Sequence, residues 1–161
     1  MKLKLTGPLL KPSINKSICR QAIKFYATLL MSKRLMDSLE IEFIIQEKED
    51  FENPHEVGTC SCLDYETRPK IFEIEIKNDM GFVRTLKTIA HEMVHVEQSA
   101  TDRLHFYHGY KMARMGNVKI RMDKVVYWDQ EWEIEAAGRE HGLYRRFVEF
   151  RNGEYNEKLK K

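Results

Sequence analysis

The chain lacks a long run of apolar residues. Its apolar stretches are far shorter than the roughly 20 residues that a membrane-spanning helix needs. Lysines interrupt the apolar residues at the N-terminus, so residues 1–8 do not form the continuous core of a secretory signal peptide. We therefore expect a cytoplasmic protein without a membrane partner.

Cysteine is scarce, with three residues at positions 19, 60 and 62. An odd number of cysteines does not make a disulfide framework and suits a reducing compartment. Cys60 and Cys62, with His55 nearby, could suggest a metal site. However, zinc-binding cysteine pairs usually have two residues between them, and this pair has one and no second pair to complete it. We therefore predict reduced thiols.

A large excess of charge of either sign is also missing, because 27 basic and 25 acidic residues leave a net charge of +2. This balance gives no overall attraction to nucleic acid or to a membrane surface. Basic residues do gather locally, at Lys111, Arg114, Lys119, Arg121 and Lys124. We predict a solvated hairpin or helix face here, and phosphate contact is the alternative.

The chain does contain the pattern His-Glu-x-x-His, at residues 91–95, within an amphipathic stretch. Apolar residues recur at helical spacing from Val83 to Val94, which predicts a helix. On that helix His91 and His95 lie one turn apart on the same face, so both imidazoles can bind one ion. Glu92 lies beside them, where a zinc hydrolase places its general base. The alternative is a pair of core histidines that bind carbonyl groups.

The remaining periodicity predicts one α+β domain over residues 1–161, with an extended lead-in at 1–12 and a flexible, charged tail at 152–161. A long helix is expected at 14–39 and another at 130–150. Strands are expected at 41–45, 59–65 and 71–76, and an irregular loop or hairpin at 101–120 precedes one or two short strands up to residue 127. A small twisted sheet should pack against the histidine-bearing helix and the C-terminal helix.

Two histidines leave a zinc site incomplete, because catalytic zinc usually takes three protein ligands and a water. The predicted C-terminal helix supplies carboxylates within residues 131–136, Glu-Trp-Glu-Ile-Glu-Ala. An unpaired charge on an apolar helical face would cost several kcal/mol unless a cation neutralised it. Glu131, Glu133 and Glu135 are therefore candidate ligands or neighbours of the ion.

His-Glu-x-x-His followed by residues 127–136, Tyr-Trp-Asp-Gln-Glu-Trp-Glu-Ile-Glu-Ala, resembles the small phage and bacterial gluzincin-type zinc metallopeptidases. The resemblance covers residues 83–148. It implies a compact zincin-like fold, bound Zn²⁺, a peptide or protein substrate, and the cytoplasm of a bacterium or of a phage-infected cell. In such families the third ligand often precedes an alanine, which implies Glu135. Glu131 and Glu133 are then neighbouring contacts or alternative ligands, and Glu131 stands where related sequences tend to have proline.

A second resemblance rests on His108-Gly109, because SprT-like proteases, which cut proteins bound to DNA, also have a His-Gly pair after the His-Glu-x-x-His helix. It implies His108 as the third ligand and nucleic acid as a partner. The phenylalanine that follows this pair in those proteases is not matched here, which favours Glu135. A non-catalytic module that keeps zinc for stability or for peptide binding is a further alternative, and the intact Glu92 argues against it.

Two further features would complete a peptidase. A donor beside the metal must stabilise the oxyanion, and His141, Tyr144 or Tyr127 could supply it. Ordinary aromatic packing is the alternative role of each. The strand at 71–76, if it lies at the sheet edge above the metal, would bind an extended peptide through main-chain hydrogen bonds.

Overall fold

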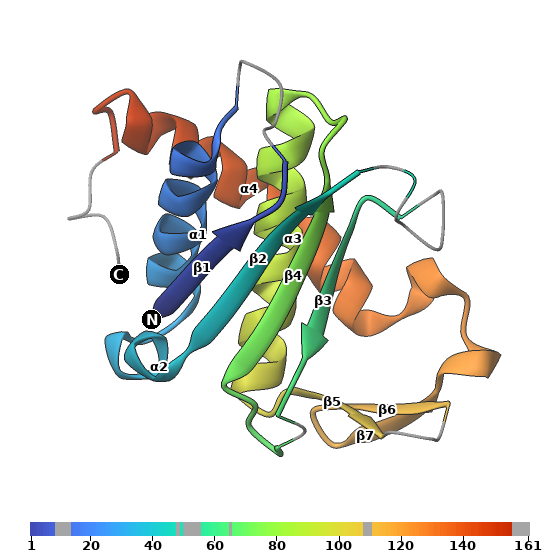
Figure 1. Cartoon of the computed structure of the whole chain (residues 1–161). Helices are drawn as coiled ribbons and strands as arrows, with labels where there is room; N and C mark the ends of the chain where they lie inside the picture. The colour runs from blue at the N-terminus through green and yellow to red at the C-terminus, as the bar shows by residue number, and fades with distance from the viewer. Residues whose placement is uncertain (9–13, 48, 50–55, 65, 108–110, 156–161) are drawn as a thin grey trace.

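The computed structural model describes residues 1–8, 14–47, 49, 56–64, 66–107 and 111–155. Its α+β architecture, with a small sheet packed against helices, confirms the predicted fold class (Figure 1). No helix in these ranges is both long enough and apolar enough to cross a membrane. The elements are, in chain order, β1 (Lys2–Thr6), α1 (Lys16–Leu30), α2 (Lys33–Ser38), β2 (Glu40–Gln46), β3 (Gly58–Cys62), β4 (Ile71–Lys77), α3 (Phe82–Ala100), β5 (Leu104–Tyr107), β6 (Met112–Met115), β7 (Val118–Arg121), the 3₁₀ turns η2 (Met122–Lys124) and η3 (Tyr127–Asp129), and α4 (Glu131–Arg151).

The main sheet has the strand order β1-β2-β4-β3, in which β1, β2 and β4 are parallel and β3 is antiparallel to β4. Successive side chains point to opposite faces of a strand, so the alternating sequences of β2 and β4 make one face apolar and the other charged. α1, α3 and α4 lie on the apolar face (Figure 1). The buried residues of that face are Ile41, Phe43, Ile45, Phe72, Ile74 and Ile76.

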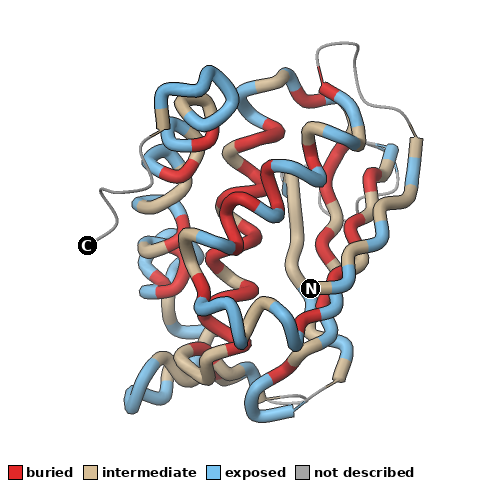
Figure 2. Tube along the Cα trace, turned by 90° about the vertical axis from the view of Figure 1, so that its left-hand side faces the viewer, coloured by how far each residue is buried: buried red, intermediate tan, exposed pale blue. Residues whose placement is uncertain are grey.

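α3 lies between the sheet and the other helices, and most of its residues are buried. Its contact with α1 includes a hydrogen bond of 3.2 Å from the Tyr26 hydroxyl to the carbonyl of Leu86. Figure 2 shows the buried residues gathered along the inner sides of the helices and the sheet, with exposed residues outside. The helix with the His-Glu-x-x-His pattern is therefore the most enclosed element of the fold.

The predicted helix at 14–39 is wrong in one respect, because the structure divides it into α1 and α2. α1 ends where Met31 takes an extended backbone conformation. Ser32 then caps a new helix, since its side chain accepts a hydrogen bond of 3.3 Å from the backbone N–H of Leu35. The Ser32 side chain can bond to a backbone N–H at the start of a new helix, and this bond competes with continuation of α1. The chain then changes direction and leads through α2 to β2.

Aromatic rings join α4 to α1. Phe147 is fully buried, and its ring centroid lies 5.7 Å from that of Phe25 and 5.6 Å from that of Tyr26. Phe150 stacks on Phe25 at 4.7 Å between ring centroids. This packing sets the rotation of α4 about its own axis, and therefore decides which of its side chains face α3.

The segment after α3 forms a second, antiparallel sheet in the order β5-β6-β7. The predicted hairpin at 101–120 and strand near 118 are thus present. A strand at 125–127 was also expected and is wrong, because residues 127–129 form the turn η3. Leu104, Ala113 and Trp132 make a small hydrophobic core that attaches this sheet to the start of α4.

The predicted strand at 71–76 is present, but it does not meet the condition for peptide binding, which was a position at the sheet edge. That segment is β4, and it lies between β2 and β3. β3 forms the edge, and the short sequence Gly-Thr-Cys-Ser-Cys gives it little apolar surface to bury. β4 is interior because its backbone N–H and C=O groups pair with β2 on one side and with β3 on the other.

Candidate metal centre

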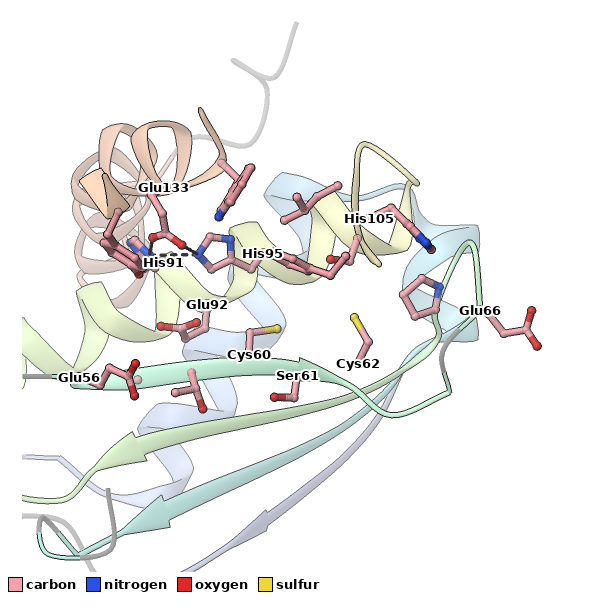
Figure 3. Close-up of a pocket in the computed structure, with 18 residues that line it drawn as sticks. Glu56, Cys60, Ser61, Cys62, Glu66, His91, Glu92, His95, His105 and Glu133 are labelled. Carbon is pink, nitrogen blue, oxygen red and sulfur yellow. Dashed lines mark hydrogen bonds and ion pairs between the residues drawn. The ribbon is translucent and has the colours of Figure 1, made fainter. Parts of the chain in front are cut away.

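Three side chains converge on one point between α3 and α4 (Figure 3). The Nε2 atoms of His91 and His95 lie 3.1 Å apart. The Glu133 carboxylate approaches them, with Oε2 at 3.2 Å from His91 Nε2 and Oε1 at 3.5 Å from His95 Nε2. One ligand atom from each residue falls within 4.8 Å of the others, so a single ion could contact all three.

The structure corrects the predicted third ligand, because Glu133 and not Glu135 faces the histidines. Two residues along an α-helix correspond to a rotation of about 200°, so these carboxylates point away from one another. Glu133 lies on the α3 side of α4 and is 5% exposed. Glu135 instead accepts hydrogen bonds from Arg103 and Arg139. Glu131, the third candidate, is exposed.

The other ring nitrogen of each histidine also has a partner. His91 Nδ1 lies 3.3 Å from Glu140 Oε2, and His95 Nδ1 lies 2.9 Å from Gln98 Oε1. Glu140 follows Glu133 by seven residues, about two helical turns, so one face of α4 supplies both contacts to His91. A proton on Nδ1 that is donated outward leaves Nε2 free to bind a metal, which is the usual arrangement of zinc-bound imidazoles.

Glu135 contacts neither histidine directly, but it contacts Gln98, the partner of His95. The Gln98 amide nitrogen donates to Glu135 Oε2 at 3.0 Å and to the carbonyl of Trp132 at 3.2 Å, which turns the amide oxygen toward His95. Burial raises the pKa of Glu135, but hydrogen bonds from Arg103 and Gln98 outweigh it and leave the pKa at about 2. Glu135 therefore stays ionised and fixes the orientation of Gln98.

Glu92 lies beside the two histidines and is 5% exposed. Burial raises its pKa to about 7, although the neighbouring His95 and His91 act in the opposite direction. A carboxylate with a pKa near 7 can both accept and return a proton at neutral pH.

Gly58, at the start of β3, makes room for Glu92. A Cβ atom on residue 58 would lie 2.5 Å from Cγ2 of Thr88 and 2.8 Å from Oε1 of Glu92. Contacts this short do not occur, so any side chain at residue 58 would move one of these groups. The edge strand therefore approaches α3 closely because residue 58 is a glycine.

The electrostatics of the site favour a positive charge at the point of convergence. Burial raises the pKa of Glu133, yet hydrogen bonds with His91 and His95 lower it to about 2. Burial lowers the pKa of His91, but hydrogen bonds with Glu133 and Glu140 raise it to about 10. Two imidazole nitrogens and a carboxylate that share a positive charge match the His₂Glu donor set of catalytic zinc sites. The residues present therefore fit a divalent metal ion.

The convergence point opens into a cleft of about 430 Å³. β3 lines one wall, α3 lines the base, and residues from β5, η3 and the start of α4 line the opposite wall. Figure 3 shows Cys60 and Cys62 on β3 directed toward α3. Both thiols are free, as predicted, and no group of metal-binding side chains in the described ranges includes them. His55 lies outside the described residues.

Of the three predicted oxyanion donors, Tyr127 is the one that the structure brings to the site. It lines the cleft, and its hydroxyl is near enough to the Glu133 carboxylate to lower the pKa of Glu133. Burial raises the pKa of Tyr127, and so does the neighbouring Glu133. His141 is exposed, and Tyr144 packs against the main core, so neither belongs to the cleft lining that the structure describes. The alternative ligand His108 lies outside the described residues.

Sequence reasoning missed Gln98, Glu140 and Arg103. The helical spacing of Gln98 from His95, three residues, could have indicated a contact on the same face. No local pattern could have indicated Glu140 or Arg103, because both reach the site through contacts between distant elements. No protein-family model, curated protein or solved structure matches this chain.

Proposed function

We propose that the protein is a zinc-dependent metallopeptidase. The observation that carries the proposal is the convergence of His91, His95 and Glu133 beside the buried Glu92, in a cleft bordered by an edge strand. A structural zinc site is enclosed by four protein ligands, whereas the described residues supply three here and the site opens to a cleft. A buried carboxylate beside an open site is the arrangement of a hydrolase.

His91, His95 and Glu133 would hold the ion. A divalent zinc ion in such a site lowers the pKa of a bound water toward about 7 and polarises a carbonyl group. Glu140 and Gln98 would keep the two imidazole rings oriented, because each contacts an Nδ1 atom. Tyr127 would stabilise the negative charge that develops on the carbonyl oxygen, since it lines the cleft and its hydroxyl could turn from Glu133 to that oxygen.

Glu92 would move the proton. Its carboxylate accepts a proton from the attacking water while the water oxygen bonds to the carbonyl carbon. The carbon–nitrogen bond then breaks, and Glu92 gives this proton to the leaving amine nitrogen. The second proton of the water leaves the new carboxylic acid and passes to the amine, so the products are a carboxylate and an ammonium group, and Glu92 returns to its starting state. The burial of Glu92, which raises its pKa, favours the uptake of the proton from water.

The edge strand offers a place for the substrate backbone. Hydrogen bonds join the N–H of Leu63 to Ile71 and the N–H of Lys77 to Val57, so the odd-numbered residues of this strand face β4. The backbone N–H and C=O groups of Gly58, Cys60 and Cys62 then point toward the open edge. An extended peptide could pair with them as an added strand, which favours a peptide substrate.

Among the residues that the structure describes, no contact favours the DNA-associated alternative. Arg114 pairs with Asp102, and Arg121 pairs with Asp123 at 2.8 Å. The ammonium group of Lys119 lies 5.7 Å from the centre of the Tyr107 ring. These partners fit the predicted solvated surface.

The proposal is tested with Glu92→Gln, which keeps the shape of the side chain but cannot accept the proton. We expect the variant to bind zinc as the wild-type protein does and to lose at least about 100-fold in peptide cleavage. Glu131→Gln is the matched control, because Glu131 is an exposed glutamate on the same helix as Glu133. Wild-type protein that holds one zinc ion yet cleaves no member of a broad peptide library would overturn the proposal.

A further inference from the structure

The cleft follows β3 and α3 from the metal centre toward the small sheet. At one end, Gly58 lies against Glu92, and at the other end Cys62 on β3 and Ser99 on α3 both line the cleft. The seven residues from Glu92 to Ser99 span about 10 Å along a helix. This is the length of about three residues in an extended chain. A substrate paired with β3 would therefore place neighbouring side chains beyond the metal centre, toward β5.

The end of the cleft near β5 is apolar. Leu104 and Trp132 are each 2% exposed and belong to the small hydrophobic core, so their side chains are held in place by packing. Phe106 packs edge to face against Trp132, at 5.7 Å between ring centroids, and remains 39% exposed. An exposed aromatic ring on a rigid support, at the wall of a cleft, offers a contact surface for an apolar side chain.

Apart from its histidines, the cleft is lined by charged residues of one sign. Among the described lining residues, the carboxylates are Glu56, Glu66, Glu92 and Glu133, and lysine and arginine are absent. A divalent ion would balance Glu92 and Glu133, which leaves the two outer carboxylates. Figure 3 shows Glu56 at one end of the cleft and Glu66 at the other. An acidic side chain in the substrate would therefore meet like charge on either side, while a basic one would meet opposite charge.

We propose that the cleft selects an extended polypeptide segment with a large apolar side chain held at Phe106 and without acidic residues beside it. This inference rests on the proposed function for the position of the cleavage point, but the binding preference follows from the cleft itself. Phe106 is the specificity-determining residue of this selection. The substrates are then unfolded or extended regions of proteins, because folded domains bury such side chains and present few free strands.

The experiment measures peptide binding and cleavage separately. A set of extended peptides carries Phe, Leu, Ala, Lys or Glu at each position in turn, around an otherwise fixed sequence. Binding to zinc-loaded Glu92→Gln protein is measured by fluorescence anisotropy, and cleavage by the wild-type protein is measured by mass spectrometry. At one position we expect Phe and Leu to bind roughly 10-fold or more tightly than Ala, as one apolar pocket allows. At the adjoining positions Glu should bind more weakly than Lys.

Variants assign the preference to Phe106. Phe106→Ala should remove most of the discrimination between Phe and Ala, and Phe106→Leu should keep part of it. Val118→Ala is the control, because Val118 is 56% exposed on β7 and does not line the cleft. Unchanged zinc affinity in each variant shows that the fold is intact.

The possible outcomes separate this inference from the proposed function. Binding without any apolar preference, or a preference that Phe106→Ala leaves unchanged, would overturn the inference even if the wild-type protein is an active peptidase. Selective binding through Phe106, with no cleavage by the wild-type protein, would support the cleft assignment and overturn the peptidase proposal.

Discussion

Glu133 and Glu135 are two positions apart on α4 and have opposite environments. The Glu133 carboxylate contacts two histidines, while the Glu135 carboxylate accepts hydrogen bonds from two arginines and from the Gln98 amide. The first would contact the ion directly, and the second would act through Gln98 on the ring of His95. The two side chains should therefore differ in how much they contribute to metal affinity.

Alanine and glutamine variants measure this difference. We expect Glu133→Ala to lose stoichiometric zinc, because the site keeps only two ligands. Glu135→Gln should weaken zinc binding by less than the roughly 10- to 100-fold that is usual for an outer contact of a metal-bound histidine, because Glu135 acts through Gln98. Zinc affinity is measured by competition with a chromophoric chelator, and Glu131→Gln should show no change. Equal losses in Glu133→Ala and Glu135→Gln would contradict this assignment.

A substitution at Gly58 tests whether the close approach of β3 to α3 positions Glu92. Gly58→Ala would place a Cβ against Thr88 and Glu92, so we expect a loss of about 1–3 kcal/mol in the free energy of unfolding from overpacking. Peptide cleavage should also fall, since Glu92 is displaced, while zinc affinity stays unchanged. Urea unfolding and kcat measure the two effects.

Gly138→Ala is the control for this substitution, because a Cβ at residue 138 meets nothing within 4 Å. Gly138 lies within α4, where alanine is the better helix former, so the control should be stabilised by up to about 1 kcal/mol. Normal kcat in Gly58→Ala would show that Glu92 does not depend on this close approach.

At the scale of elements, α1 buries two titratable groups against α3. Cys19 and Tyr26 are both fully buried. Burial raises the pKa of Cys19 from 9.0 to about 12, and it also raises the pKa of Tyr26. The packing of α1 therefore requires both groups to keep their protons.

This requirement predicts a loss of stability in alkaline solution. Above pH 9 the unfolded chain releases the Cys19 proton while the folded chain keeps it, so the unfolded state binds fewer protons and the free energy of unfolding falls as pH rises. By pH 10 the loss from Cys19 should be on the order of 1 kcal/mol. Urea unfolding at pH 8, 9 and 10 measures it. The decline should be smaller in Cys19→Ala, and parallel curves for the two proteins would contradict the argument.

At the scale of the whole molecule, the proposed metal joins α3 to α4. His91 and His95 lie on the helix that packs on the sheet, and Glu133 lies on the helix that packs on α1 and the small sheet. A ligand that binds the folded state alone stabilises it by mass action. Zinc should therefore stabilise the entire fold and not only the cleft.

We expect zinc at about 1,000 times its dissociation constant to add about 4 kcal/mol to the free energy of unfolding. For a domain of this size that corresponds to a rise in Tm of roughly 8–16 °C. Differential scanning calorimetry with zinc and with excess chelator measures the shift. Glu92→Gln should keep it and Glu133→Ala should lose it. A Tm that does not respond to zinc would show that the three side chains hold no ion.

Much of the fold follows from local patterns in the sequence. The α+β class and strands β2 and β4 were predicted from apolar periodicity, and so were the helical positions of His91, Glu92 and His95. The helix break at Ser32 and the turn η3 were not, because a cap competes with a continued helix at only one or two residues.

What the sequence by itself determined is the helix that presents two imidazoles and a carboxylate together, because the angle between residues on one helix depends only on their separation in the chain. Only the tertiary structure decided that Glu133 completes the group and that β3 forms the sheet edge. Both depend on contacts between distant segments. Packing of Trp132 and Phe147 sets the rotation of α4. Because β4 pairs with β2 and with β3, β3 is left at the edge of the sheet.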